Sequence, residues 1–265
     1  MNIIIITGAS SGIGREFARQ LDKRLYSVDV FWLISRRKKE LEALAQTLEH
    51  PVRIFDMDLT LESDIFAFKA ILEKECPVVR MLVNCAGYGL MGAFDRVSMG
   101  EQSGQIDLNC KALVQMTHMC IPYMKPNSRI LQLASSAAFL PQADFAVYAA
   151  SKSFVLSFSR ALAQELKEKS IYVTAVCPGP VNTAFFERAE KFGSTLAVKK
   201  LTMVEASEVV SDALKASAQR RRVCITGIPM KLFYLAAGIF PHEIMLQGAA
   251  ALKKLEKIKT GKGKT

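Results

Sequence analysis

Short apolar runs alternate with longer amphipathic segments along most of this chain of 265 residues. The runs are rich in Ile, Val, Leu and Phe, and they predict strands at residues 2–6, 29–34, 52–55, 80–83, 129–133, 171–177 and 223–226. The segments between them predict helices at residues 15–24, 38–48, 63–74, 101–124, 148–169 and 205–218. Because the strands are almost continuously apolar, both faces of their sheet should be buried. The sequence therefore predicts an α/β fold in three layers, with a doubly wound, seven-stranded parallel sheet between helices.

One domain is expected over residues 1–230, because no linker or repeat divides them. Within it, residues 183–203 contain no predicted strand, and a long loop in a compact domain is usually functional. Residues 231–265 should form an extension that is apolar at first and rich in lysine at its end.

The charge of the chain does not favour nucleic acid as a partner. The formal net charge is +10, but residues 253–265 hold six lysines and only one glutamate. Half of the excess therefore lies in a terminal tail, and the remainder is modest for a body of this size.

The cysteines and histidines do not predict a metal site. Six cysteines are scattered, without a C-x-x-C motif, and the chain has three histidines. Scattered thiols are typical of a reducing compartment, and the apolar run at residues 3–6 is too short for a signal peptide. The expected location is cytoplasmic, and no metal is expected.

A glycine-rich turn joins the first predicted strand to the first helix. It reads Thr7-Gly8-Ala9-Ser10-Ser11-Gly12-Ile13-Gly14. Glycines at a strand-to-helix turn let the backbone approach a phosphate, which the positive end of the helix attracts. An ordinary connecting turn is the alternative, but three glycines at the first junction favour a nucleotide. The residues expected to hold it are Gly8, Ser10, Ser11, Gly12, Ile13 and Gly14.

Further motifs follow in a fixed order, and together with the turn they resemble the short-chain dehydrogenase/reductase family. They are Asn84-Cys85-Ala86-Gly87, Asn109, Ser135, Tyr148-Ala149-Ala150-Ser151-Lys152 and Pro178-Gly179-Pro180. Each motif is weak alone, but five in register are specific. Cys85 departs from the family, which carries a second Asn at this position.

The resemblance implies a Rossmann-type fold and hydride transfer between an alcohol or carbonyl and a nicotinamide cofactor. It implies that Lys152 holds the nicotinamide ribose, that Asn109 supports a water linking Lys152 to solvent, and that Asp58 contacts the adenine. Further cofactor contacts are implied at Leu59, Asn84, Ala86, Gly87, Tyr148, Pro178, Gly179, Val181 and Thr183.

The residue types also indicate the chemistry of the site. Tyr148 and Lys152 are four residues apart, so their side chains should share one helix face. A nearby cation lowers the pKa of a phenol, which would make Tyr148 a general acid/base, and Ser135 could hydrogen-bond the reacting oxygen. The alternative is an exposed Tyr/Lys pair on a solvated helix face. The glycine turn and Ser135, which occur in the same sequence, favour the catalytic interpretation over it.

The end of the second predicted strand favours NADP(H) over NAD(H). An NAD enzyme needs an acidic residue there, whereas this strand ends in Ser35, Arg36 and Arg37. A guanidinium suits a 2′-phosphate by charge and geometry. A basic, solvated helix start is the alternative, and it accounts for Lys38 and Lys39.

Aromatic residues near the predicted strand ends favour a bulky apolar substrate. The candidates are Tyr88, Leu90, Phe139, Phe145, Phe185 and Phe186, alongside Ser135 and Tyr148; ordinary core packing is the alternative for each. In the family, residues 183–203 would form a substrate lid, and extensions like this one occur in members acting on steroids, bile acids and other lipid-like alcohols or ketones. We expect a secondary alcohol or ketone, with a hydroxysteroid or bile acid as the leading example. The alternatives are acyl or small carbonyl substrates, or a catalytically silent nucleotide-sensing or membrane-docked protein.

The apolar part of the extension needs a covering partner, because soluble monomers rarely expose such a patch. The candidates are the pocket rim, a second subunit, or a membrane surface attracted to the lysines. The apolar residues do not form an evident helical stripe opposite a basic face. The rim, or a homodimer or homotetramer, is therefore favoured over a membrane.

Overall fold

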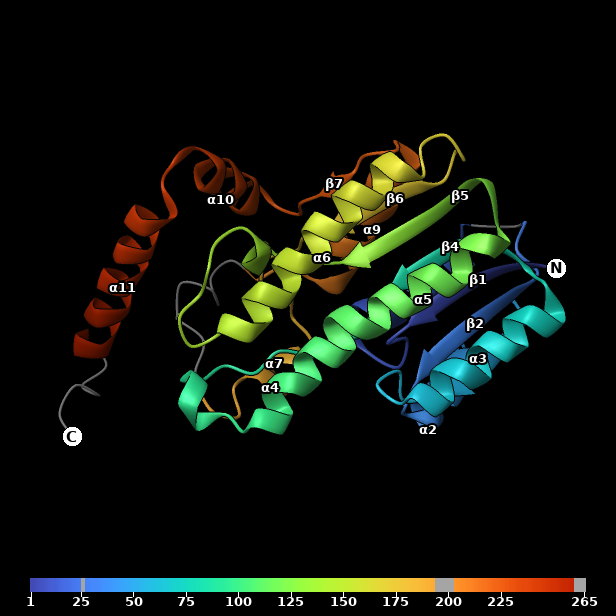
Figure 1. The fold of residues 1–265 in the computed structure, drawn as a ribbon, viewed down its shortest axis with the longest axis horizontal. Helices are drawn as coiled ribbons and strands as arrows, with labels where there is room; N and C mark the ends of the chain where they lie inside the picture. Colours follow the sequence, from blue (N-terminus) through green and yellow to red (C-terminus); the bar gives the residue numbers. More distant parts are fainter. Residues whose placement is uncertain (25–26, 194–202, 260–265) are drawn as a thin grey trace.

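Residues 1–24, 27–193 and 203–259 are described by the computed structural model (Figure 1). Seven strands form one parallel sheet in the order β3-β2-β1-β4-β5-β6-β7. They are β1 (Asn2–Thr7), β2 (Val30–Ser35), β3 (Val52–Asp56), β4 (Val78–Asn84), β5 (Met124–Leu133), β6 (Tyr172–Val176) and β7 (Val223–Cys224). The strand order reverses between β1 and β4, and ligands of such sheets bind where this reversal occurs. The predicted seven-stranded parallel fold is confirmed.

Helices cover both faces of the sheet (Figure 1). One layer consists of α1 (Gly12–Asp22), α2 (Lys38–Ala45) and α9 (Ala206–Ala218), and the other of α3 (Glu62–Glu75), α5 (Leu113–Cys120) and α6 (Ala146–Glu165). The alternation along β1 shows why both layers are needed. Ile3 and Ile5 belong to one core cluster and Ile4 and Ile6 to the other, and all four are fully buried.

The long helix expected at residues 101–124 is divided. It consists of α4 (Met99–Ile106), a π-helical turn (Asp107–Ala112), α5 and a 3-10 turn (Ile121–Tyr123). Pro122 lacks the N–H group that an α-helix needs, so α5 ends at Cys120 and β5 begins at Met124, five residues before its predicted start. The π-helical turn carries Asn109, and such turns occur frequently at functional sites.

The C-terminal extension forms two helices, α10 (Ile228–Ile239) and α11 (His242–Lys259). Helix α10 carries no apolar stripe opposite a basic face, because both of its faces bear apolar side chains. Ile228, Leu232, Leu235 and Ile239 are exposed and lie four, three and four residues apart, on one face of the helix. The remaining apolar residues pack inward, so the sequence mixes two apolar faces and conceals each of them.

No helix in the described part of the chain is both long enough and apolar enough to cross a bilayer.

Two glycines in helices provide a test of the packing. A Cβ atom on Gly14 would lie 2.4 Å from the carbonyl oxygen of Gly8, whereas one on Gly100 would meet open space. We expect Gly14→Ala to lower the free energy of unfolding by about 1–3 kcal/mol, because the backbone must shift. Gly100→Ala should raise it by up to about 1 kcal/mol, because alanine favours a helix. Urea denaturation of both variants measures these changes, and equal effects would contradict this account.

Candidate active site

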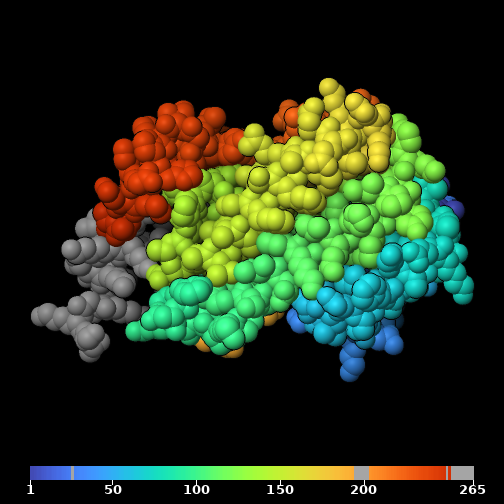
Figure 2. All heavy atoms as spheres, viewed as in Figure 1, coloured from blue at the N-terminus to red at the C-terminus, as the bar shows by residue number. Residues whose placement is uncertain are grey.

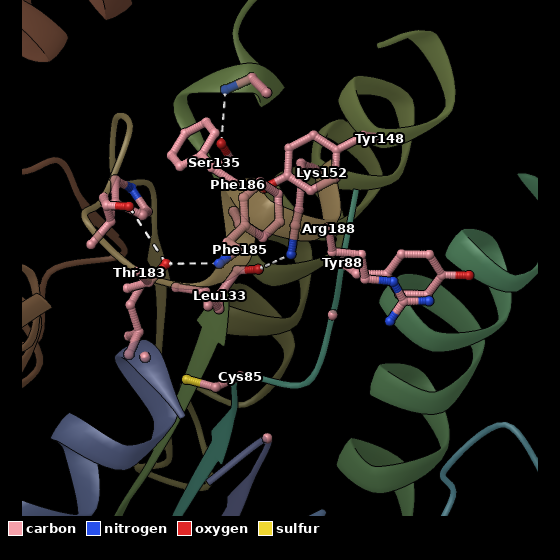
Figure 3. A pocket seen from close by; sticks show the side chains of 18 of the residues that line it. Cys85, Tyr88, Leu133, Ser135, Tyr148, Lys152, Thr183, Phe185, Phe186 and Arg188 are labelled. Carbon is pink, nitrogen blue, oxygen red and sulfur yellow. Dashed lines mark hydrogen bonds between the residues drawn. The ribbon is translucent and has the colours of Figure 1, made fainter. Parts of the chain in front are cut away.

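A large cavity lies at the carboxyl ends of the parallel strands, with a volume of about 1370 Å³. Its walls come from the loops after β1, β2, β4, β5 and β6, from α7 (Phe185–Ala189), and from the C-terminal helices. Figure 3 shows that Tyr148 and Lys152 of α6 and Phe185 and Phe186 of α7 converge on it. The cavity is therefore large enough for both a dinucleotide and a second molecule.

The glycine turn forms one end of the cavity. Gly8 and Gly12 have φ angles of 67° and 52°, which only glycine adopts readily. A Cβ atom on Gly8 would lie 2.8 Å from the backbone nitrogen of Ala86, so the turn packs directly on the loop after β4. The Thr7 hydroxyl joins the two segments by accepting hydrogen bonds from the N–H groups of Cys85 and Ala86, each at 3.1 Å. The turn and the start of α1 thus line the cavity, and phosphate binding there stays a prediction.

Two arginines lie beside this turn. Arg37 donates hydrogen bonds to the hydroxyls of Ser10, at 2.9 and 3.1 Å, and of Ser11. Arg36 forms an ion pair with Asp58 at 3.3 Å, and its side chain is more than half exposed. Both guanidinium groups therefore line the cavity where β2 ends.

Ser135 and Tyr148 meet at the centre of the cavity. Ser135 follows β5, and its hydroxyl accepts a hydrogen bond from the N–H group of Ala137 at 3.1 Å (Figure 3). The Tyr148 ring stacks on Phe145 with 4.3 Å between centroids, and the Ser135 hydroxyl is near enough to the phenol to influence its pKa. The two hydroxyls are therefore placed to share one substrate oxygen.

Burial controls the protonation of Tyr148. It raises the pKa of this phenol to about 12, and the nearby Ser135 hydroxyl opposes the rise only in part. The expectation that Lys152 lowers the pKa of Tyr148 is therefore wrong. The Lys152 nitrogen lies 5.7 Å from the centre of the tyrosine ring, and burial of the phenol dominates its pKa.

Lys152 is itself buried, and its ammonium group donates a hydrogen bond of 2.6 Å to the carbonyl oxygen of Leu133. Burial lowers the pKa of Lys152 to about 8. A Cβ atom on Gly87 would lie 3.4 Å from the lysine nitrogen and 2.8 Å from Asn109 Oδ1. Gly87 thus keeps space open between these two side chains.

Asn109 lies behind the cavity wall and is fully buried. Its Nδ2 atom donates to the carbonyl oxygen of Tyr88 at 2.9 Å and to the Ser151 hydroxyl at 3.0 Å, and its Oδ1 atom accepts from the Tyr88 N–H group at 3.0 Å. These bonds hold the loop after β4 against α6. Its proposed part in a water chain stays a prediction.

Most of the predicted site residues line the cavity, and three others join Asn109 outside it. Asn84 is buried beneath the floor, where it donates to Thr117 and Gln132. Phe139 packs against Tyr234 on α10, and Leu90 is buried, with its N–H group on Gln105. These two correspond to the core-packing alternative. Of the predicted lid, residues 194–202 lie outside the described residues, and Thr183, Phe185 and Phe186 line the cavity.

Several lining residues were not predicted one by one. The C-terminal helices contribute Met230, Phe233, Leu246 and Ala250, a position that only the apolar composition of the extension indicated as a rim. Arg188 also lines the cavity, and its guanidinium lies 3.5 Å from the centre of the Tyr88 ring. In the described ranges, no cluster of three or more His, Cys, Asp or Glu residues could hold a metal.

Comparison with known proteins assigns the family. The model of the short chain dehydrogenase family matches residues 2–192, and the chain belongs to this family. Human 17-beta-hydroxysteroid dehydrogenase type 3 is 30% identical over 275 residues, covering 96% of this chain and 84% of that protein. Sulfoacetaldehyde reductase 2 of Chromohalobacter salexigens is 35% identical over 69% of this chain and 74% of its own length. A short-chain dehydrogenase from Sphingobium yanoikuyae, solved in complex with NADPH, superposes with a TM-score of 0.76 at 27% identity, covering 95% of this chain and 96% of that one. The protein is therefore an oxidoreductase with a nicotinamide cofactor.

The buried charge of Lys152 should lower the stability of the protein. Lowering the lysine pKa from 10.5 to about 8 corresponds to about 3 kcal/mol. We expect Lys152→Met to raise the free energy of unfolding at pH 7 by up to this amount. Between pH 8 and 10.5 only the unfolded wild type binds the proton, so the stability of the wild type rises with pH and the gain shrinks.

Urea denaturation at several pH values measures this difference. The exposed Lys111→Met is the control, and its effect should not depend on pH in this way. A gain for Lys152→Met that stayed constant from pH 7 to 10.5 would show that the lysine charge is not the cause.

Proposed function

We propose that the protein is an NADP(H)-dependent oxidoreductase that interconverts a secondary alcohol and a ketone on a bulky apolar substrate. The observation that carries the proposal is that Ser135, Tyr148 and Lys152 line one large cavity whose walls are mostly apolar. A glycine turn that fits a dinucleotide phosphate forms the other end of the same cavity.

The residues around the turn fit a nicotinamide dinucleotide. A side chain on Gly8 or Gly14 would fill the cradle, so the phosphates would be held by the backbone at the start of α1. Lys152 would hold the nicotinamide ribose, and Arg36 and Arg37 a 2′-phosphate. When bound, the cofactor supplies or accepts the hydride.

Tyr148 would act as the general acid in ketone reduction. Because burial raises its pKa to about 12, the phenol carries its proton at neutral pH and can donate it to the developing alkoxide. Ser135, whose hydroxyl is fixed by the N–H group of Ala137, would donate a hydrogen bond to the same oxygen. The Lys152 ammonium, with a pKa of about 8, would stabilise the phenolate left behind.

The walls beyond Tyr148 support a bulky apolar substrate. Phe145, Phe185 and Phe186 line the cavity on one side, and Met230 and Leu246 of the C-terminal helices line it as well. Such walls reward the burial of apolar area and suit a hydroxysteroid or bile acid. The likeness to the human 17-beta-hydroxysteroid dehydrogenase agrees with this choice.

A small carbonyl compound with an anionic group is the second candidate. Arg188 places a guanidinium at the cavity wall, where it could pair with a carboxylate or sulfonate. The likeness to a sulfoacetaldehyde reductase agrees with this alternative.

A substrate screen that follows NADPH absorbance separates the two candidates. Steroid and bile-acid ketones should be reduced with a higher kcat/KM than small anionic aldehydes. The Arg188→Ala variant should leave the ketone reaction nearly unchanged. If steroid ketones are inert and Arg188→Ala selectively loses turnover of anionic aldehydes, the second candidate is favoured.

Removal of the Tyr148 hydroxyl should abolish most of the turnover. Tyr148→Phe keeps the ring stack with Phe145 but removes the transferable proton, so we expect kcat to fall by about 10²–10⁴-fold. The dissociation constant of NADPH should change little, as measured by fluorescence titration. Tyr123→Phe, in the 3-10 turn before β5, is the control. Retention of more than about a tenth of the activity would refute the assignment.

Removal of the Arg36 guanidinium should change the choice of cofactor. Arg36→Ala should weaken NADPH binding by about 1.5–3 kcal/mol, which is the contribution of a hydrogen bond to a charged group. NADH binding should remain nearly unchanged, because NADH lacks the 2′-phosphate. Lys38→Ala is the matched control, since Lys38 pairs with Glu42 on the surface of α2. Equal losses for both cofactors would mean that Arg36 supports only the fold.

A further inference from the structure

Helix α10 presents two apolar faces, and the body of the protein covers one of them. Phe233, Tyr234 and Ala237 pack against the core cluster beneath α6, and Met230 lines the cavity. On the opposite face, an outer stripe of four aliphatic side chains is open to solvent. The exposed fractions are 72% for Ile228, 61% for Leu232, 57% for Leu235 and 74% for Ile239.

The outer stripe continues around the corner between the two C-terminal helices. Phe240 and Ile244, at the junction of α10 and α11, are more than half exposed. The atoms of the two C-terminal helices that are drawn in colour gather at one end of the molecule (Figure 2). An apolar surface of this kind marks a contact with a partner.

We propose that the outer stripe docks peripherally on a membrane surface that contains anionic phospholipids. An aliphatic helix face inserts at the boundary between headgroups and acyl chains, and basic residues nearby strengthen the attachment. Residues 228–265 carry such basic residues in their sequence. Lys231 lies within α10, and residues 253–265 hold six lysines and one glutamate.

The charge distribution favours a lipid surface over a second copy of the chain. A second copy of the chain would carry the same aliphatic stripe and the same tail of net charge +5. Its tail therefore offers no opposite charge to the lysines, whereas an anionic bilayer attracts them. Attachment to a bilayer strengthens with the apolar area that is buried and with the attraction to anionic lipids, and the stripe and the tail supply these two contributions.

Docking through the outer stripe would place α10 between the lipid and the cavity. Met230 and Phe233 line the cavity from the face of α10 opposite the stripe, and Leu246 of α11 lines it as well. The cavity would then lie one helix away from a bilayer that dissolves an apolar substrate. This closeness to the substrate rests on the proposed function, whereas the docking itself does not.

Cosedimentation of the full-length protein with vesicles tests the proposal. We expect binding to vesicles of phosphatidylcholine mixed with phosphatidylglycerol, and much weaker binding to phosphatidylcholine alone. The double variant Leu232→Gln/Leu235→Gln should reduce binding to the mixed vesicles at least about tenfold, because two aliphatic side chains no longer insert. The variant Lys253→Gln/Lys254→Gln/Lys257→Gln should reduce it at low salt.

Two controls keep the result specific. Phe66 on α3 is as exposed as the stripe residues, and Phe66→Gln should leave vesicle binding unchanged. All variants should bind NADPH like the wild type, which excludes a loss of fold. Since the readout is lipid binding, an inactive enzyme would not affect it.

Three results would overturn the proposal. The first is the absence of wild-type binding to the mixed vesicles, and the second is equal binding by the double leucine variant. The third is a dimer in analytical ultracentrifugation that dissociates in the double leucine variant without any vesicle binding, which would assign the stripe to a second copy.

Discussion

The close contact between the glycine turn and the loop after β4 is the constraint on which the site depends. Gly8 lies so near the Ala86 backbone that a side chain cannot fit between them, and Thr7 ties the two loops together. The strands are parallel and neighbouring, so their carboxyl ends meet at one edge of the sheet. This contact brings the expected phosphate-binding turn and the expected nicotinamide-binding loop into one cavity. The helices that bury the sheet hold the arrangement in place.

Within the cavity, burial rather than charge pairing sets the resting state of the acid/base pair. Tyr148 packs between aromatic rings, and the buried Lys152 ammonium donates to a backbone carbonyl oxygen. Desolvation raises the pKa of the phenol and lowers that of the ammonium. The phenol therefore holds its proton more tightly than in water, and the ammonium holds its proton less tightly.

Much of this organisation could be predicted from the sequence, because its signals are local. Continuously apolar strands fixed the parallel sheet, and the glycine turn, Ser135, Tyr148 and Lys152 were identifiable by spacing. The pKa of Tyr148 could not be predicted, because it depends on aromatic neighbours brought in from other elements, such as Phe185. The sequence could not predict whether Phe139 and Leu90 face the cavity or the core. An apolar side chain near a strand end gives the same sequence pattern in either place.

The C-terminal helices show a different limit. An amphipathic pattern is readable when one face is polar, but α10 is apolar on two faces and its periodicity is lost. Only the exposure of each side chain in the fold separates the inner from the outer residues.

The π-helical turn at Asp107–Ala112 has a consequence for how the helices on either side of it can change. A π-helical turn contains one more residue than an α-helical turn would need. Loss of a single residue from it would rotate α4 relative to α5 by about 100°, one residue's step in an α-helix. Asn109 would then turn away from the Tyr88 loop, or the buried face of α5 would turn away from the sheet. The extra residue therefore sets the rotation of α4 relative to α5. With it, Asn109 faces the Tyr88 loop while the buried face of α5 packs against the sheet.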